Sequence, residues 1–245
     1  MTRTLIHLSG PDTRDFLQGL VTNDVKKLDT APIYAAMLTP QGKYIADFFL
    51  IREGDSDVLM DVNETLSAGL IQRLTMYKLR ADVKITPLDG KHLHRGLGPV
   101  PEDGWADPRH SEMGWRAWRD TSADQDDVDW DALRVAHLIP ESGVELTPDS
   151  FILEYNFETL NGVDFRKGCY VGQEVTARMK HKTELRKGLA VVTVDGTADT
   201  PAEITSNGKP AGRLLTVAGG RGIAYLRFDR ATQDMESGSA RISRL

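Results

Sequence analysis

The last quarter of the chain alternates short apolar runs with turn residues, and this pattern constrains the fold most. The runs fall at 189–194, 202–205, 211–217 and 222–228, and Gly, Pro, Asn and Asp separate them. Strands of this length and spacing are typical of a small β-barrel. We therefore expect a C-terminal barrel, and we interpret the polar residues after Asp229 as a frayed tail.

A β-hairpin is predicted earlier in the chain. Apolar, aromatic-rich runs at 34–38 and 44–51 flank Thr39-Pro40-Gln41-Gly42-Lys43, whose Pro and Gly are spaced as in a type I turn. Asp47 interrupts the second run. A carboxylate inside an apolar strand is unfavourable unless it reaches water or a partner. Asp47 is therefore a candidate catalytic residue, and the alternative is a strand-edge carboxylate paired with a nearby Lys or Arg.

Helical periodicity follows the hairpin. Asn63 is a predicted N-cap, and apolar residues from Leu66 to Tyr77 recur at spacings of three and four. Short strands are expected on either side, at 58–62 and 83–86. Another helix is predicted from the Ser9-Gly10-Pro11-Asp12 start signal to about Leu20. The combination predicts an α+β layer, with helices on one face of a mostly antiparallel sheet.

Composition narrows the class of protein. The chain has 245 residues, 40% of them hydrophobic, a net charge of −6 and one cysteine. One thiol allows neither an internal disulfide framework nor a self-contained metal site, so any iron–sulfur cluster would be shared with a partner. No apolar run is long enough for a membrane span, and we expect a soluble protein of a bacterial cytoplasm without membrane contact.

The single cysteine lies in the stretch 166–174, RKGCYVGQE. A thiol reacts or binds metal as thiolate, and the nearby cations Arg166 and Lys167 favour that form. If a helix begins after Gly172, its first N–H groups add to the same field. Cys169 is thus a candidate reactive thiol or transient cluster ligand. The alternative is a small buried hydrophobe.

Positive charge gathers around the cysteine. Residues 166–187 have a net charge of +5 in a chain whose net charge is −6. A solvated basic face explains this run equally well, but its place beside the cysteine indicates an anion site. Folate carboxylates are the expected anions, with Arg178 among the binding residues, and RNA phosphate is the alternative.

The motif Lys167-Gly168-Cys169-Tyr170-Val171-Gly172-Gln173-Glu174 resembles the K-G-C-[FY]-x-G-Q-E signature of YgfZ-type folate-binding proteins, relatives of the glycine cleavage T-protein. Further segments resemble the same family, and together they cover most of the chain: 16–20 with Thr22-Asn23-Asp24, 38–43, and 161–165. The resemblance implies a multi-domain ring around a central channel. Its parts would be an α+β folate-binding region of two subdomains at 1–182 and the barrel at 183–245.

The resemblance also implies a function. Family members are associated with maturation of four-iron iron–sulfur proteins and with tetrahydrofolate. We accordingly expect assembly or client proteins as partners and tetrahydrofolate, or a derivative, as cofactor. The motif residues expected to bind it are Lys167, Gly168, Tyr170, Gly172, Gln173 and Glu174. Outside the motif, Asn23 lies in a segment that either approaches the ligand or only caps a turn. Glu154 and Asn156 could hydrogen-bond a pterin's amide edge.

Two other functions remain open. A folate-dependent aminomethyl or one-carbon transferase would use Asp47 as its acid. The T-protein has adjacent acidic residues in the corresponding hairpin, and Ala46 replaces one of them here, which weakens that interpretation. The third possibility is a thiol redox or RNA-modification partner protein without catalysis of its own.

Overall fold

The chain forms two compact units. The computed structural model describes residues 2–124, 127–182, 185–231 and 234–245. One unit comprises Met1–Asp127 with Glu158–Val175, and the other Val128–Phe157 with Thr176–Leu245. The expected domain boundary at 182/183 involves residue 183, which lies outside the described residues, and that division stays a prediction.

The first unit contains an antiparallel sheet of five strands in the order β2-β3-β4-β1-β5. The strands are β1 (Arg3–Ser9), β2 (Ile33–Leu38), β3 (Tyr44–Glu53), β4 (Asp57–Asn63) and β5 (Lys84–Leu88). A smaller sheet has the order β6-β8-β7 and is made of β6 (His92–Gly96), β7 (Trp105–Ala106) and β8 (Trp115–Arg119). The helical elements are α1 (Thr13–Gln18), η1 (Val25–Asp29), α2 (Glu64–Lys78) and η2 (Ser111–Met113).

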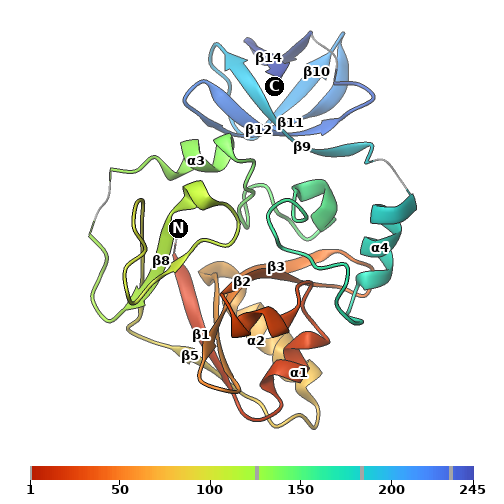
Figure 1. Ribbon diagram of the computed structural model, residues 1–245. Coiled ribbons are helices and arrows are strands. Elements are labelled where there is room, and N and C mark those ends of the chain that lie inside the picture. The colour runs from red at the N-terminus through yellow and green to blue at the C-terminus, as the bar shows by residue number, and fades with distance from the viewer. Residues whose placement is uncertain (1, 125–126, 183–184, 232–233) are drawn as a thin grey trace. The chain divides into compact units, whose positions relative to one another are not determined.

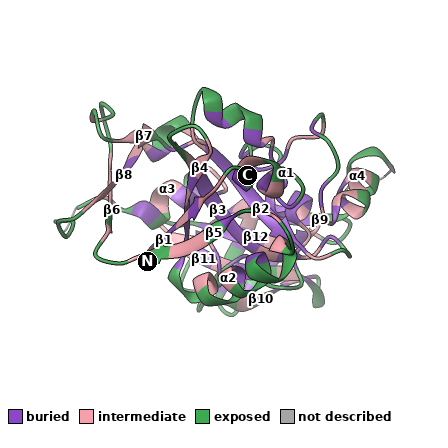
Figure 2. Ribbon diagram, turned by 90° about the horizontal axis from the view of Figure 1, so that it is seen from below, coloured by how far each residue is buried: buried purple, intermediate pink, exposed green. Residues whose placement is uncertain are grey.

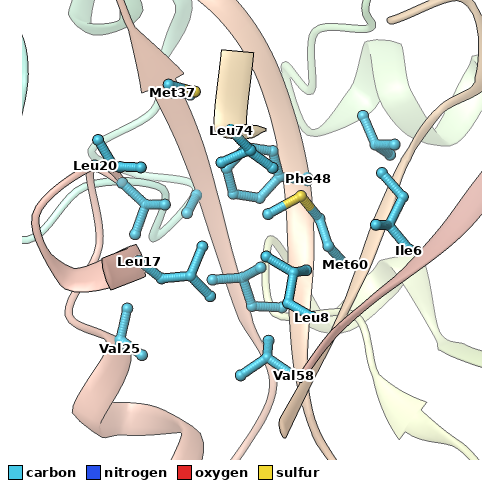
Figure 3. Packing of buried hydrophobic residues seen from close by; sticks show 14 of the residues in the cluster. Ile6, Leu8, Leu17, Leu20, Val25, Met37, Phe48, Val58, Met60 and Leu74 are labelled. Carbon is cyan, nitrogen blue, oxygen red and sulfur yellow. The ribbon is translucent and has the colours of Figure 1, made fainter. Parts of the chain in front are cut away.

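The core of this unit lies on one face of the five-stranded sheet. Alternate residues of β3, among them Phe48, pack with Leu8, Met60 and the α1 residue Leu17 (Figure 3). Leu74 of α2 closes the same cluster. These helices and the antiparallel sheet confirm the predicted α+β layer. Sheet residues of the opposite parity face away from this core.

The sequence predicted the start of α2 correctly and the ends of α1 less accurately. The Asn63 side chain accepts a hydrogen bond from the Thr65 N–H, which confirms it as the N-cap of α2. Helix α1 is shorter than predicted, because it begins at Thr13 and ends at Gln18. Strand β1 was not predicted, although it lies between β4 and β5. Its apolar residues do not alternate cleanly with polar ones, so period-two reasoning missed it.

The second unit contains a closed barrel of six strands in the order β10-β11-β12-β9-β14-β13 (Figure 1). The strands are β9 (Lys187–Asp195), β10 (Ala202–Ser206), β11 (Lys209–Ala218), β12 (Arg221–Arg227), β13 (Met235–Ser237) and β14 (Ala240–Arg244). The barrel expectation is confirmed. The frayed tail is wrong, because β14 pairs with β9 and the buried Met235 and Ile242 join the barrel core. The alternation of polar and apolar residues in this segment is too short to predict β13 and β14 from sequence.

Helix α3 (Trp130–Ala136) and the turn η3 (Ile152–Tyr155) pack on this barrel. Buried Glu145 receives hydrogen bonds from Arg134 and from the Thr216 hydroxyl of β11, so one carboxylate joins the segment to the barrel wall. Helix α4 (Gln173–Lys182) connects the two units along the chain. Among the described residues, no helix has the length and apolar character needed to cross a membrane.

Candidate functional site

Cys169 lies at an exposed point of the loop that leads into α4. Cys169 and the neighbouring Gly168 are exposed, whereas Lys167 and Tyr170 on either side of them are buried. Helix α4, which follows this loop, consists mainly of exposed and intermediate residues (Figure 2). Helix α4 begins at Gln173, as the motif predicted. The alternative of a buried structural cysteine is therefore wrong.

Lys167 anchors this loop to the end of α1. Its Nζ donates to the carbonyl oxygens of Gln18 at 2.8 Å and Val21 at 2.5 Å, and it lies 4.9 Å from the Tyr170 ring centroid. A cation at a helix C-terminus satisfies carbonyls that lack intrahelical partners. Burial lowers the pKa of Lys167 to about 8, while the Asp24 and Asp164 charges act in the opposite direction.

A contact between two glycines anchors the other end of the loop. Gly172 has φ +85°, and a Cβ there would lie 2.6 Å from the Thr39 carbonyl oxygen and 3.3 Å from the Gly42 Cα. Gly42 has φ +76°, and its Cβ would lie 2.8 Å from the Val175 Cβ. Both positions thus need glycine for conformation and for space. The hairpin segment at 38–43 and the cysteine motif are therefore two sides of one packed contact.

The entry to the loop is fixed by the polar corner after α1. Asn23 Nδ2 donates to the carbonyl oxygens of Asn161 at 2.7 Å and Tyr34 at 2.8 Å. The Thr22 hydroxyl donates to the Gly162 carbonyl at 2.6 Å, and the Asp164 N–H donates to the Thr22 carbonyl at 3.0 Å. Asn23 is buried. Both hydrogens of its amide nitrogen are thus directed at backbone, which supports the structural alternative over ligand contact.

The remaining motif residues divide by exposure. Tyr170 is buried, Gln173 is half-buried and Glu174 is exposed, as is Arg178 beyond the motif. The loop is thus held at its entry, its middle and its exit, and these anchors leave Cys169 in solvent. Such an arrangement can present a thiol or thiolate to another molecule in a fixed position. The ligand role assigned to the other motif residues stays a prediction.

Asp47 is buried, with 3% of its surface exposed, in an interior strand of the sheet. Its two carboxylate oxygens accept hydrogen bonds from the Tyr34 hydroxyl at 2.9 Å and the Tyr44 hydroxyl at 2.6 Å. Burial and the Asp47 charge raise the pKa of Tyr34 well above its ordinary value, so this phenol stays a donor. The expected strand-edge position is wrong, because β3 lies between β2 and β4. The expected pairing with a nearby arginine has support, since burial acts to lower the pKa of Arg3 and Arg109 and the Asp47 charge contributes to raising it.

Sequence reasoning missed the ionic cluster on the same side of the sheet. Asp61 receives hydrogen bonds from Arg3 and Arg116, and both guanidinium groups lie over the Phe49 ring, 5.3 Å and 4.3 Å from its centroid. Arg109 lies 4.9 Å from the same centroid and pairs with Asp107. Asp61 interrupts the apolar run at 58–62 as Asp47 interrupts its own, and that signal could have been used.

Glu154 and Asn156 lie in the second unit, on and just after η3. The Tyr225 hydroxyl donates to Glu154 Oε2 at 2.6 Å, and the Tyr155 and Tyr225 rings stack with centroids 5.4 Å apart. Asn156 has φ +66°, and its side-chain nitrogen donates to the Leu138 carbonyl at 3.2 Å. Glu154 is half-buried, so one edge of its carboxylate is held by a phenol beside a flat aromatic pair.

Within the described residues, no three His, Cys, Asp or Glu side chains gather closely enough to hold a metal ion. Cys169 would therefore need ligands from elsewhere to bind a cluster.

Known proteins align along most of the chain. Mitochondrial iron–sulfur cluster assembly factor IBA57 of Mus musculus is 30% identical over 272 residues, covering 93% of this chain and 76% of the mouse protein. The IBA57 homologue of Phaeosphaeria nodorum is also 30% identical, covering 94% of this chain and 70% of that protein. This chain belongs to the IBA57 family of iron–sulfur cluster assembly factors. The YgfZ-type resemblance of the motif is thereby confirmed.

Two further comparisons concern the fold of this IBA57-family chain. A family model described as the C-terminal β-barrel domain of CAF17 matches residues 186–244. The crystal structure of glycine cleavage system aminomethyltransferase T from Bartonella henselae superimposes with a TM-score of 0.79 at 13% identity, covering 99% of this chain and 82% of that chain. The expected T-protein-like α+β class with a C-terminal barrel is confirmed.

The IBA57 relatives also correct the expected location. The mouse, human and fungal proteins are mitochondrial. The expectation of a bacterial cytoplasmic protein conflicts with these relatives and is wrong.

Proposed function

We propose that this chain acts in the maturation or repair of four-iron iron–sulfur proteins and presents Cys169 to a partner protein. The exposed thiol on a loop anchored at three places is the observation that carries the proposal. Membership of the IBA57 family supports the iron–sulfur role. Because one thiol cannot hold a cluster alone, the partner supplies the remaining ligands. Assembly factors or client proteins are accordingly the partners.

Lys167 and the paired glycines hold the loop in this proposal. The Lys167 ammonium donates hydrogen bonds to backbone carbonyls, so Lys167 acts as a positioning residue and other groups bind folate. Because the loop is already fixed, less conformational entropy is lost when a partner binds at the thiol.

We propose further that tetrahydrofolate, or a derivative, binds this chain. Glu154 supports this: a carboxylate can accept two hydrogen bonds from a pterin's amide edge, and the stacked Tyr155 and Tyr225 offer a flat apolar surface. Asn156 contributes its side-chain oxygen, since its nitrogen is bonded to Leu138. The exposed Arg178 of the basic segment is suited to the folate carboxylates.

Transferase chemistry is the alternative that Asp47 would support. Both of its oxygens accept hydrogen bonds from phenols, and Ala46, its chain neighbour, faces the hydrophobic core. A general acid must reach the reacting group. This arrangement favours the assembly role. The transferase would be favoured if the chain formed methylenetetrahydrofolate from an aminomethyl donor and Asp47→Asn lost that activity.

The iron–sulfur proposal is tested by complementation. In cells that lack the protein, the chain should restore the activity of an aconitase-type four-iron enzyme and leave a two-iron enzyme unchanged. Restoration of neither would refute the assembly role.

The folate proposal is tested by titrating the chain with tetrahydrofolate and following tryptophan emission. Saturable quenching is expected, with at least about tenfold weaker binding in Glu154→Gln, because loss of one charged hydrogen-bonding group of this kind costs about 1.5–3 kcal/mol. Arg178→Ala should weaken binding less. Glu203→Gln, an exposed barrel residue, is the matched control. Absence of saturable quenching would remove folate and leave the assembly role standing.

A further inference from the structure

The C-terminal end of α2 carries three exposed apolar side chains. Met76 is 68% exposed, Tyr77 36% and Leu79 87%. In contrast, Leu70 and Leu74 of the same helix are buried against the sheet. Figure 2 shows exposed and buried residues side by side on α2. Apolar side chains gathered at one place on the surface often mark an interaction site.

Leu79 is also held in a strained backbone conformation. Its φ is 46° and its ψ −101°, and the Ala81 N–H donates to the Lys78 carbonyl at 2.8 Å. This is the geometry of a type II′ turn with Leu79 at the position that favours glycine. The Asp82 N–H donates to Asp12 Oδ2 at 2.8 Å, which holds the turn in place. An exposed leucine in a strained turn does not stabilise the fold. Backbone strain of this kind often occurs at functional positions.

Cations surround these side chains. We call the group the α2 tip, and it consists of Arg73, Met76, Tyr77, Lys78, Leu79, Arg80 and Lys84. None of its four cations forms an ion pair within the described residues. Asp82 is the one acid at 73–84, so this stretch has a net charge of +3 in a chain of net charge −6. Arg, Met and Tyr are residue types enriched in protein interfaces.

We propose that the α2 tip docks an acidic iron–sulfur protein, with Leu79 and Met76 entering an apolar hollow ringed by carboxylates. The class of partner rests on the proposed function, whereas the surface rests on exposure, strain and charge. A protein partner can place its carboxylates opposite these four cations alone. An extended anionic surface such as a membrane would also be repelled by the negative charge on the rest of this chain. The tip supplies a compact apolar centre with a charged rim.

Photo-crosslinking tests the surface directly. The full chain, with p-benzoylphenylalanine in place of Met76, is expressed in cells that lack the protein and irradiated, and the adducts are identified by mass spectrometry. An adduct with an acidic iron–sulfur protein, reduced at least fivefold by Arg73→Glu with Arg80→Glu, is expected. The crosslinker at Val100, which is also exposed and apolar in the same unit, should give no such adduct. No adduct, or one with lipid, a second copy or any other protein, would overturn the proposal.

Leu79→Gly separates docking from a structural role. Relief of the strained turn should outweigh the extra freedom that glycine gives the unfolded chain and raise the melting temperature by about 2 °C, while the Met76 adduct should fall at least threefold. A variant that loses stability, or one that keeps its full adduct yield, would overturn the assignment of Leu79. Failure of the wild-type chain to restore four-iron activity would instead count against the proposed function, because the adduct is identified independently of that activity.

Discussion

Lys167 and Cys169 are two residues apart but have opposite surroundings. The Lys167 ammonium is bonded to backbone carbonyls, and the Cys169 side chain is exposed. The motif predicted that both residues are functional, but it did not predict that Lys167 is buried and Cys169 exposed. The partners of Lys167 lie 149 and 146 positions away in the sequence, so no local pattern could identify them.

Lys167→Met tests the positioning role of Lys167. The change removes the cation and keeps the approximate length of the side chain, and we expect four-iron enzyme activity to fall at least about threefold. The rate at which iodoacetamide alkylates Cys169 should change in the same variant, because Lys167 acts through the loop that holds the thiol. Lys209→Met, at an exposed barrel position, is the control. Lost activity with an unchanged alkylation rate would assign Lys167 another role.

Asp61 provides a test of the buried ionic cluster. Asp61→Asn removes the carboxylate that pairs with Arg3 and the nearer of the two that pair with Arg116, whose other partner Asp107 lies 3.8 Å away. Breaking a buried pair in this way costs about 3–5 kcal/mol of unfolding free energy. Asp55→Asn, at a fully exposed carboxylate, should leave that free energy unchanged within error. Urea unfolding at pH 7 measures both.

The same carboxyl group predicts a pH dependence. Burial alone would raise the pKa of Asp61, but Arg3 and Arg116 outweigh burial and lower that pKa below its ordinary value of 3.8. The stabilisation is therefore present above pH 3.8 and is lost as pH falls through the lower folded-state pKa. The difference between wild type and Asp61→Asn should shrink in acid. A constant difference from pH 7 to the acid limit of folding would contradict this pKa.

At the scale of elements, one turn and one helix cap were predicted correctly, whereas two strands that depend on distant partners were missed. The Thr39–Lys43 turn and the Asn63 cap depend on residues adjacent in sequence, and the structure contains both. Strand β1 depends on pairing with β4 and β5, and β14 on pairing with β9 and β13, which no local signal reports. The glycine contact between the hairpin turn and the motif is likewise tertiary.

The two motif glycines form a matched pair for testing that contact. Gly172→Ala places a Cβ 2.6 Å from the Thr39 carbonyl at φ +85°, and it should destabilise the fold by about 1–3 kcal/mol or more. Gly168→Ala meets no atom within 4 Å, so its unfolding free energy should change by less than about 0.5 kcal/mol. Thermal and urea unfolding compare the two. Equal stability of the variants would refute the packed contact.

At the scale of the whole molecule, two units with separate hydrophobic cores share one chain. The first unit contains the anchored cysteine loop and the α2 tip, and the second contains Glu154 and the barrel. Fold class and family followed from sequence because the motif and the barrel pattern are local. The fixed, exposed state of the thiol did not, since it depends on contacts between residues distant in the chain.

The most direct test of the central claim is the activity of an aconitase-type enzyme in cells that carry only the Cys169→Ala variant. Because the thiol is exposed, its removal should leave the amount of folded protein unchanged. We predict that four-iron activity falls to the level of cells lacking the protein. Full restoration of that activity by Cys169→Ala would contradict the account.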